Sequence, residues 1–119
     1  MKILLVKPSE YPEVKDIPGD LKSMQKLVDG LIQAIYPFPE PVALICNDEG
    51  KLIGLPMNRA IPEIRDVICG DFFLCSALAN SSEFTSLTDD QIAQFEERFH
   101  YSEVFLPLDN ESYLTVRVS

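Results

Sequence analysis

Three consecutive large apolar residues, Phe72, Phe73 and Leu74, constrain the fold of this chain more than any other feature. Successive side chains of a β-strand point to opposite faces of its sheet. A strand that contains these three residues must therefore be buried on both sides or packed against a partner. The surrounding segment 61–79 predicts one or two strands, with Gly70 and Asp71 as a turn or bulge.

Short apolar runs that end at prolines or polar turns predict the other strands. Their branched and alternating residues are typical of half-buried or buried strands rather than helices. They lie at residues 2–7, 31–38 and 112–119, with a short edge strand at Val14 and Ile17.

The clearest local pattern is at residues 41–55, where an apolar run meets a four-residue polar turn. The turn begins with Asn47 and ends with Gly50, which suits a type I turn closed by a left-handed glycine. A second strand then starts at Lys51. This pattern predicts a β-hairpin, and Pro56 ends its second strand or places that strand at a sheet edge.

Two amphipathic segments predict helices. Residues 20–30 begin with Asp20, whose carboxylate can cap the first turn, and end with Gly30, which suits the left-handed position after a helix. Residues 86–99 carry the pair Thr88 and Gln91, which is typical of a capping box.

In the second helical segment, Ile92, Phe95 and Phe99 form the apolar stripe, and Leu87 and Ile92 have the spacing of a hydrophobic staple. The order of elements predicts one α+β domain over residues 1–119. We expect a mixed, mainly antiparallel sheet with two helices packed on one of its faces.

The acidic balance of the chain limits its partners. The chain has 19 acidic and 10 basic residues, which gives a net charge of −9. Such a chain repels nucleic-acid phosphates and anionic membranes, so we expect neither direct nucleic-acid binding nor membrane binding. No apolar run approaches membrane-spanning length and the first residues lack the pattern of a signal peptide, so a cytoplasmic location is predicted.

Catalytic chemistry is not predicted. The chain has no nucleophile elbow, phosphate-binding glycine loop or dinucleotide fingerprint. Cys46, Cys69 and Cys75 have irregular spacing, and His100 is the only histidine, so neither a disulfide framework nor a zinc site is expected. We therefore expect no catalytic residue, metal or cofactor. The alternative is a thiol enzyme in which one of these cysteines pairs with His100.

The candidate binding residues are Asn58 and Arg59, with Lys51 nearby. Arginine offers a planar fork for carboxylate or phosphate, and asparagine offers both a donor and an acceptor. Together they predict a site for a small anionic ligand or a protein. The alternative is structural: Asn58 stabilises a turn, and Arg59 pairs with one of many nearby acids, such as Glu63 or Asp66.

The chain resembles a bacterial and phage family known as domain of unknown function 3846. The resemblance rests on three segments, GDLKSMQKLVDGLIQAI, ALICNDEGKLIGLPMNRAI and DVICGDFFLC, and covers residues 1–106. Within them the turn 47–52, the stretch 55–59 and the Ile68-Cys69-Gly70 segment match the family pattern. Asp29 stands where the family usually has glycine.

The resemblance implies no enzymatic activity, and it implies carriage on phages and conjugative elements. The leading hypothesis is therefore a non-enzymatic accessory domain that binds a protein or a small ligand. A second hypothesis is an acidic decoy of the antirestriction type, whose carboxylates mimic DNA phosphates. A homodimer is also considered, because Phe72, Phe73 and Phe105 could serve the core or a dimer interface.

Overall fold

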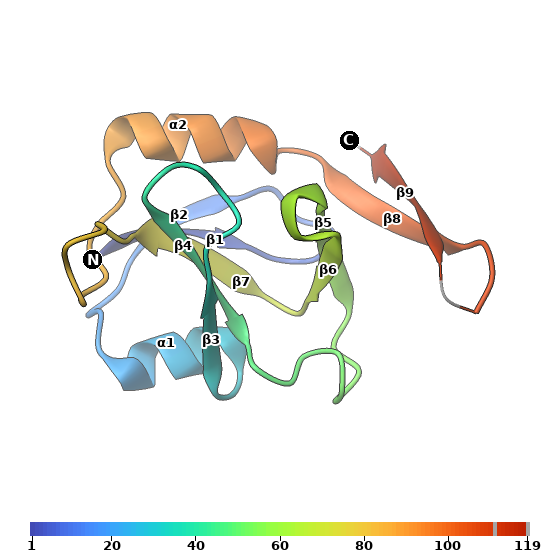
Figure 1. Cartoon of the computed structure of the whole chain (residues 1–119), viewed down its shortest axis with the longest axis horizontal. Coiled ribbons are helices and arrows are strands. Elements are labelled where there is room, and N and C mark those ends of the chain that lie inside the picture. Colours follow the sequence, from blue (N-terminus) through green and yellow to red (C-terminus); the bar gives the residue numbers. More distant parts are fainter. Residues whose placement is uncertain (111, 119) are drawn as a thin grey trace.

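The computed structural model describes residues 1–110 and 112–118. Its order of strands and helices is shown in Figure 1. The elements are β1 (Lys2–Val6), β2 (Glu13–Asp16), α1 (Leu21–Val28), β3 (Ile32–Ile35), β4 (Val42–Asn47), β5 (Met57–Ile61), a 3-10 turn (Pro62–Ile64), β6 (Asp66–Cys69), β7 (Phe72–Ser76), α2 (Asp89–Arg98), β8 (Ser102–Pro107) and β9 (Tyr113–Val118).

A five-stranded sheet with the order β2-β1-β7-β4-β3 forms the body of the protein. Two smaller sheets, β5-β6 and β8-β9, flank it. Every pairing between the described strands is antiparallel. The α+β prediction with a mainly antiparallel sheet is therefore confirmed. So are the short edge strand β2 and the division of residues 61–79 into two strands around Gly70 and Asp71.

The two helices cover opposite faces of the large sheet (Figure 1). Phe73 belongs to the core cluster that contains α1, whereas Phe72 and Leu74 belong to the cluster that contains α2. All three residues are fully buried. The prediction that both helices pack on one face is wrong. The three consecutive apolar residues of the central strand β7 require an apolar layer on each side.

The predicted helix starts are confirmed. The Asp20 carboxylate accepts a hydrogen bond from the Ser23 amide at 3.0 Å. The Thr88 hydroxyl accepts from the Gln91 amide at 3.1 Å, and the Gln91 side chain accepts from the Thr88 amide at 2.9 Å. Each cap satisfies amide groups that the first helical turn leaves without partners.

The end of α1 differs from its prediction. Asp29, not Gly30, is the left-handed residue, with a φ of 58°. Gly30 instead allows a close approach: a Cβ atom at this position would lie 2.6 Å from the Asn47 side-chain nitrogen. That nitrogen donates to the carbonyls of Val28 and Asp29 at 3.0 and 3.1 Å, so it ties β4 to the last turn of α1.

The predicted hairpin at residues 41–55 is wrong. Strand β4 pairs with β3 on one side and β7 on the other, so neither of its edges is free for residues after the turn. Residues 48–55 form consecutive turns, closed by a hydrogen bond from the Leu55 amide to the Gly50 carbonyl at 2.9 Å. The chain re-enters a sheet only at β5, which pairs with β6.

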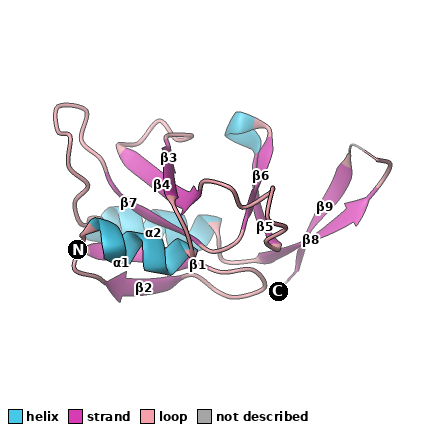
Figure 2. Cartoon of the chain, turned by 90° about the horizontal axis from the view of Figure 1, so that it is seen from below, coloured by secondary structure: helices cyan, strands magenta, loops and turns pink. Residues whose placement is uncertain are grey.

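Strands β8 and β9 form a hairpin that projects from the body (Figure 2). We call these two strands the arm. Strand β9 was predicted and β8 was not. No residue of the arm belongs to either core cluster. Neither α1 nor α2 is long and apolar enough to cross a membrane, and they are the α-helices in the part of the chain that the structure describes.

Candidate ligand-binding cleft

A cleft of about 640 Å³ opens between the small β5-β6 sheet and the arm. This volume lies within the range of clefts that bind small molecules. Most of its lining is apolar, and strand β9 closes one side with Tyr113 and Thr115. The remaining lining residues are Lys51, Gly54, Leu55, Met57, Ala60, Pro62, Arg65, Asp66, Val67 and Cys69.

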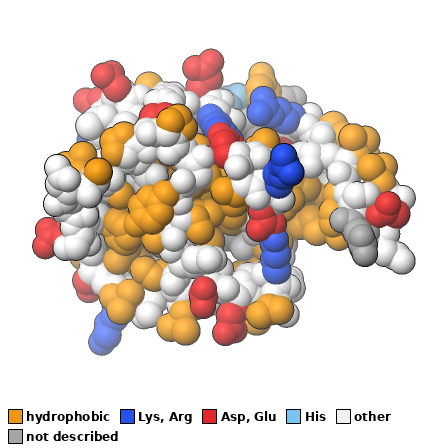
Figure 3. Space-filling model, viewed as in Figure 1, with side chains coloured by type: hydrophobic (Ala, Val, Ile, Leu, Met, Phe, Trp, Pro, Cys, Tyr) orange, Lys and Arg blue, Asp and Glu red, His pale blue; other side chains and the backbone are white. Residues whose placement is uncertain are grey.

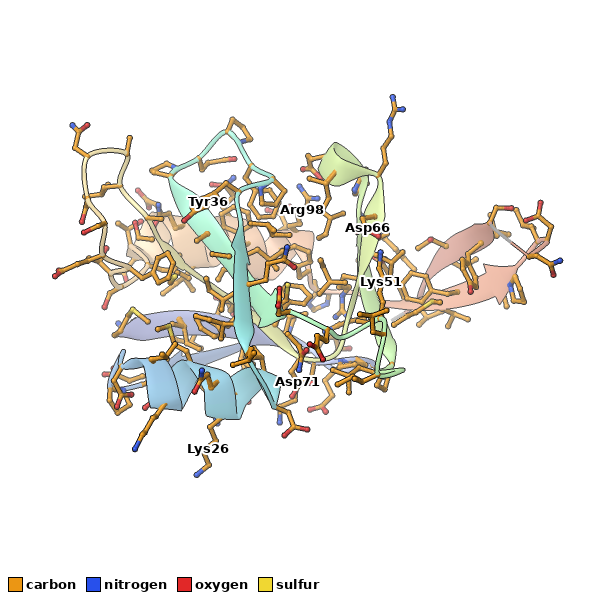
Figure 4. All side chains as sticks on the ribbon, turned by 60° about the horizontal axis from the view of Figure 1, so that its bottom comes forward. Lys26, Tyr36, Lys51, Asp66, Asp71 and Arg98 are labelled. Carbon is orange, nitrogen blue, oxygen red and sulfur yellow. The ribbon has the colours of Figure 1, made fainter. Side chains whose placement is uncertain are left out.

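The charged side chains of the cleft are two cations and one carboxylate. Lys51 forms an ion pair with Asp66, which begins β6 (Figure 4). Arg65 is exposed and follows the short 3-10 turn in a left-handed backbone conformation, with a φ of 51°. Its backbone is held there by a hydrogen bond to the Pro62 carbonyl at 3.0 Å. The cleft therefore combines apolar walls with a small excess of positive charge.

Asn58 lies behind this cleft and is 1% exposed. Its side-chain nitrogen donates to the carbonyls of Val6 and Gly70, both at 2.9 Å. Its side-chain oxygen accepts from Arg59 at 2.9 Å. These bonds fix β5 to the end of β1 and to the turn between β6 and β7.

Arg59 is fully buried. Its Nη2 donates to the carbonyls of Glu10 and Phe99 at 2.8 and 3.1 Å, and its Nη1 donates to the Asn58 side chain. Its Nε has no hydrogen-bond partner among the described residues. Burial lowers the pKa of the Arg59 guanidinium, and the negative charge of Glu103 acts in the opposite direction. The side chain thus joins β5, the loop after β1 and the end of α2.

Arg59 pairs with neither Glu63 nor Asp66, the two acids that the structural alternative gave as examples. Glu63 instead forms an ion pair with Arg98 of α2, and Asp66 pairs with Lys51. The Arg98 interaction also lowers the pKa of the Glu63 carboxyl, chiefly through the hydrogen bond between the two side chains. Backbone carbonyls take the place that these carboxylates were expected to fill.

Of the three predicted ligand-binding residues, only Lys51 lines the cleft. Asn58 and Arg59 are buried beneath it, and their direct contact with a ligand stays a prediction. Sequence reasoning missed Arg65 and Tyr113. Tyr113 could have been found, because the alternation in residues 112–119 places it on the same face as Thr115. Arg65 had no such signal, since its position depends on a tight turn.

The three cysteines are buried and free. Cys46 and Cys69 line a second, smaller cavity of about 300 Å³, and Cys75 lies in the core. Burial raises the pKa of Cys75 to about 12, and burial together with nearby Asp48 raises that of Cys46 to about 11. His100 packs against tyrosines, with its ring centroid 4.7 Å from that of Tyr11.

Thiol labelling tests the alternative of a thiol enzyme. We expect native protein at pH 8 to react slowly with Ellman's reagent at all three positions, because the thiolate is the reactive form and burial disfavours it. Labelling in denaturing urea, monitored at 412 nm, should be complete within the mixing time and provides the reference rate. One thiol that reacts at the reference rate in native protein would contradict the expectation.

One comparison with known proteins found a match. The model of a family described as "Domain of unknown function (DUF3846)" matches residues 1–100. The chain therefore belongs to this family. No curated protein and no solved structure matches the chain. The family match ends before the arm begins.

Proposed function

We propose that this member of the family is a non-enzymatic binding domain whose cleft holds a small amphipathic anion. The observation that carries the proposal is the composition of the cleft, which joins an apolar lining to two cationic side chains. An apolar ligand body would pack against Leu55, Met57 and Val67. Its anionic group would bind Lys51 and Arg65, because both cations lie among the lining residues.

The local charge of the cleft favours binding of an anion, although the whole chain carries a net charge of −9. Long-range repulsion is screened over about 8 Å at physiological salt, so the side chains inside the cleft dominate at contact. Lys51 is partly neutralised by Asp66. Arg65 makes no ion pair among the described residues, which leaves its guanidinium available. Arg65 is therefore the principal anchor in this proposal.

Asn58 and Arg59 support the same site from beneath. Met57 and Ala60 of β5 line the cleft, and the two polar residues lie between them in the strand. The pairing of β5 with β6 changes register between Met57 and Arg59. Such a bulge turns consecutive side chains to the same side of a strand. We propose that Asn58 and Arg59 hold β5 in this shape.

The biological setting is also a proposal. The carriage on phages and conjugative elements that the resemblance implies would make the protein an accessory factor. A ligand-binding domain without catalytic residues suits such a role, because an accessory factor can act by capturing a molecule or a partner.

A pair of fluorescent dyes tests the cleft. Anilinonaphthalene sulfonate carries an aromatic body with a sulfonate, and N-phenyl-1-naphthylamine has the same body without the charge. We expect the sulfonate to bind one site per native chain, more tightly than the neutral dye. Arg65→Ala should weaken sulfonate binding by about fivefold, the effect of roughly 1 kcal/mol, and leave the neutral dye unchanged. Fluorescence titration measures both constants.

Lys26→Ala provides the matched control, because Lys26 lies exposed on α1 and points away from the cleft (Figure 4). This variant removes the same unit of charge as Arg65→Ala, so it should leave both dye constants unchanged. Circular dichroism confirms that each variant is folded, since partly unfolded proteins also bind the sulfonate dye. Equal binding of the two dyes would show that the cleft does not recognise an anion.

A further inference from the structure

One face of the arm is aliphatic except for Ser102, which lies opposite Val118. In its register Val104 lies opposite Val116, and Leu106 lies opposite Leu114. Directly opposite residues share a face of a hairpin, and Val118 follows Val116 on that face by the two-residue alternation. We call Val104, Leu106, Leu114, Val116 and Val118 the outer face.

The outer face is open to solvent. Its five side chains are between 38% and 49% exposed. The opposite face of the arm is turned toward the body, since Tyr113 and Thr115 line the ligand-binding cleft and Glu103 accepts a hydrogen bond from the Ala60 amide at 2.8 Å. Figure 3 shows hydrophobic side chains along the arm. A contiguous aliphatic face of this kind marks an interaction surface.

The arm is also peripheral to the rest of the chain. It lies outside the residues that the family model matches and outside both core clusters. A two-stranded hairpin is marginally stable by itself and gains stability when another layer covers its apolar face. The body does not provide this layer for the outer face. The outer face is therefore available to an external partner.

We propose that the outer face binds the outer face of a second copy of this chain. Two such faces, related by a twofold axis, would form a two-layer sandwich of four strands with the aliphatic side chains between the layers. A twofold contact brings the same patch together from both copies, so the patch must be compatible with itself. An aliphatic face without a charged residue meets this requirement.

The net charge of the chain favours a second copy, rather than a membrane or a nucleic acid, as the partner of the outer face. The whole chain carries −9, which repels anionic surfaces. Two copies also repel each other, but only the uncharged outer faces need to touch. A six-residue strand spans about 20 Å, which exceeds the Debye length of about 8 Å in physiological salt. Because the arm projects from the body (Figures 1 and 2), contact between arms leaves the acidic bodies separated.

The area of the contact sets its strength. A face of two strands about 20 Å long covers much less than the roughly 800 Å² per partner of a standard stable interface. We therefore expect a reversible dimer that forms at high protein concentration and dissociates on dilution. Increasing salt should strengthen it slightly, because salt screens the repulsion between the bodies.

Sedimentation velocity from 5 μM to 1 mM tests the proposal. Wild-type protein should shift from monomer toward dimer across this range. Leu106→Glu should remain monomeric at every concentration, because it places a charge within the outer face. Thr115→Glu adds the same charge to the opposite face of the arm and should dimerise as the wild type does.

Each contrary result overturns the proposal. A wild-type monomer at 1 mM would show that the outer face does not bind a second copy. Equal loss of dimer in the Leu106 and Thr115 variants, or a dimer that survives Leu106→Glu, would place the contact elsewhere. Binding of monomeric protein to neutral phosphatidylcholine vesicles would assign the face to lipid instead. The wild-type measurement stands even if a variant fails to fold, and it does not depend on dye binding in the cleft.

Discussion

Replacement of Arg59 by alanine is expected to lower the free energy of unfolding by about 3 kcal/mol. The guanidinium donates to the carbonyls of Glu10 and Phe99 and to the side chain of Asn58. Its removal leaves the buried Phe99 and Asn58 acceptors and the partly buried Glu10 carbonyl without this donor, and it opens a cavity. The wild-type fold carries the free-energy cost of burying the guanidinium charge, and the variant does not. This difference offsets part of the lost stability, so the total loss stays well below the sum of the separate hydrogen-bond contributions.

Urea denaturation measures the effect, and two further variants identify its cause. Arg59→Met keeps most of the volume but none of the donors, so it should lose nearly as much stability as Arg59→Ala. Arg117→Ala removes an exposed arginine from the arm and should change stability by less than about 0.5 kcal/mol. If Arg59→Ala were as stable as wild type, the guanidinium would be available for a ligand, as the sequence predicted.

Alanine at Phe72 and alanine at Phe73 are each expected to cost about 3–5 kcal/mol. Both rings are fully buried, but they belong to different core clusters. Phe72 packs edge-to-face with Phe99 of the α2 layer, with 5.5 Å between ring centroids. Phe73 packs in the α1 layer. Each substitution therefore leaves a cavity on its own side of the sheet.

Thermal and urea unfolding of the two variants compare the two layers directly. Phe105→Ala provides the control, because Phe105 lies on the arm and outside both clusters, and it should cost less than about 1 kcal/mol. If the sheet were covered on one face only, one of the two substitutions in β7 would be as mild as the control. Two large and similar losses are the result that the two-layer structure requires.

The structural position of Arg59 also affects the proposed binding site. Its hydrogen bonds hold β5, and Met57 and Ala60 of that strand line the cleft. Loss of dye binding in an Arg59 variant would therefore follow from distortion as well as from loss of a contact. For this reason the exposed Arg65, rather than Arg59, is the informative substitution for recognition of an anion.

Local sequence determined the helices and the central strand. The caps at Asp20 and Thr88 depend on partners three residues away, so their spacing is visible in the sequence. The three consecutive apolar residues from Phe72 to Leu74 predicted burial on both sides or packing against a partner, and the structure shows burial on both sides. Lys51, which the sequence analysis placed near the candidate binding residues, lines the cleft.

Only the tertiary structure decided which strands pair and where Arg59 lies. The turn at residues 47–50 resembled that of a hairpin, but β4 already had partners on both edges in β3 and β7. The carbonyl partners of Arg59 at Lys7, Glu10 and Phe99 are separated from it by 52, 49 and 40 residues in the chain. Contacts over such distances depend on competition between strands for edges and on burial, and short-range residue patterns do not encode that competition.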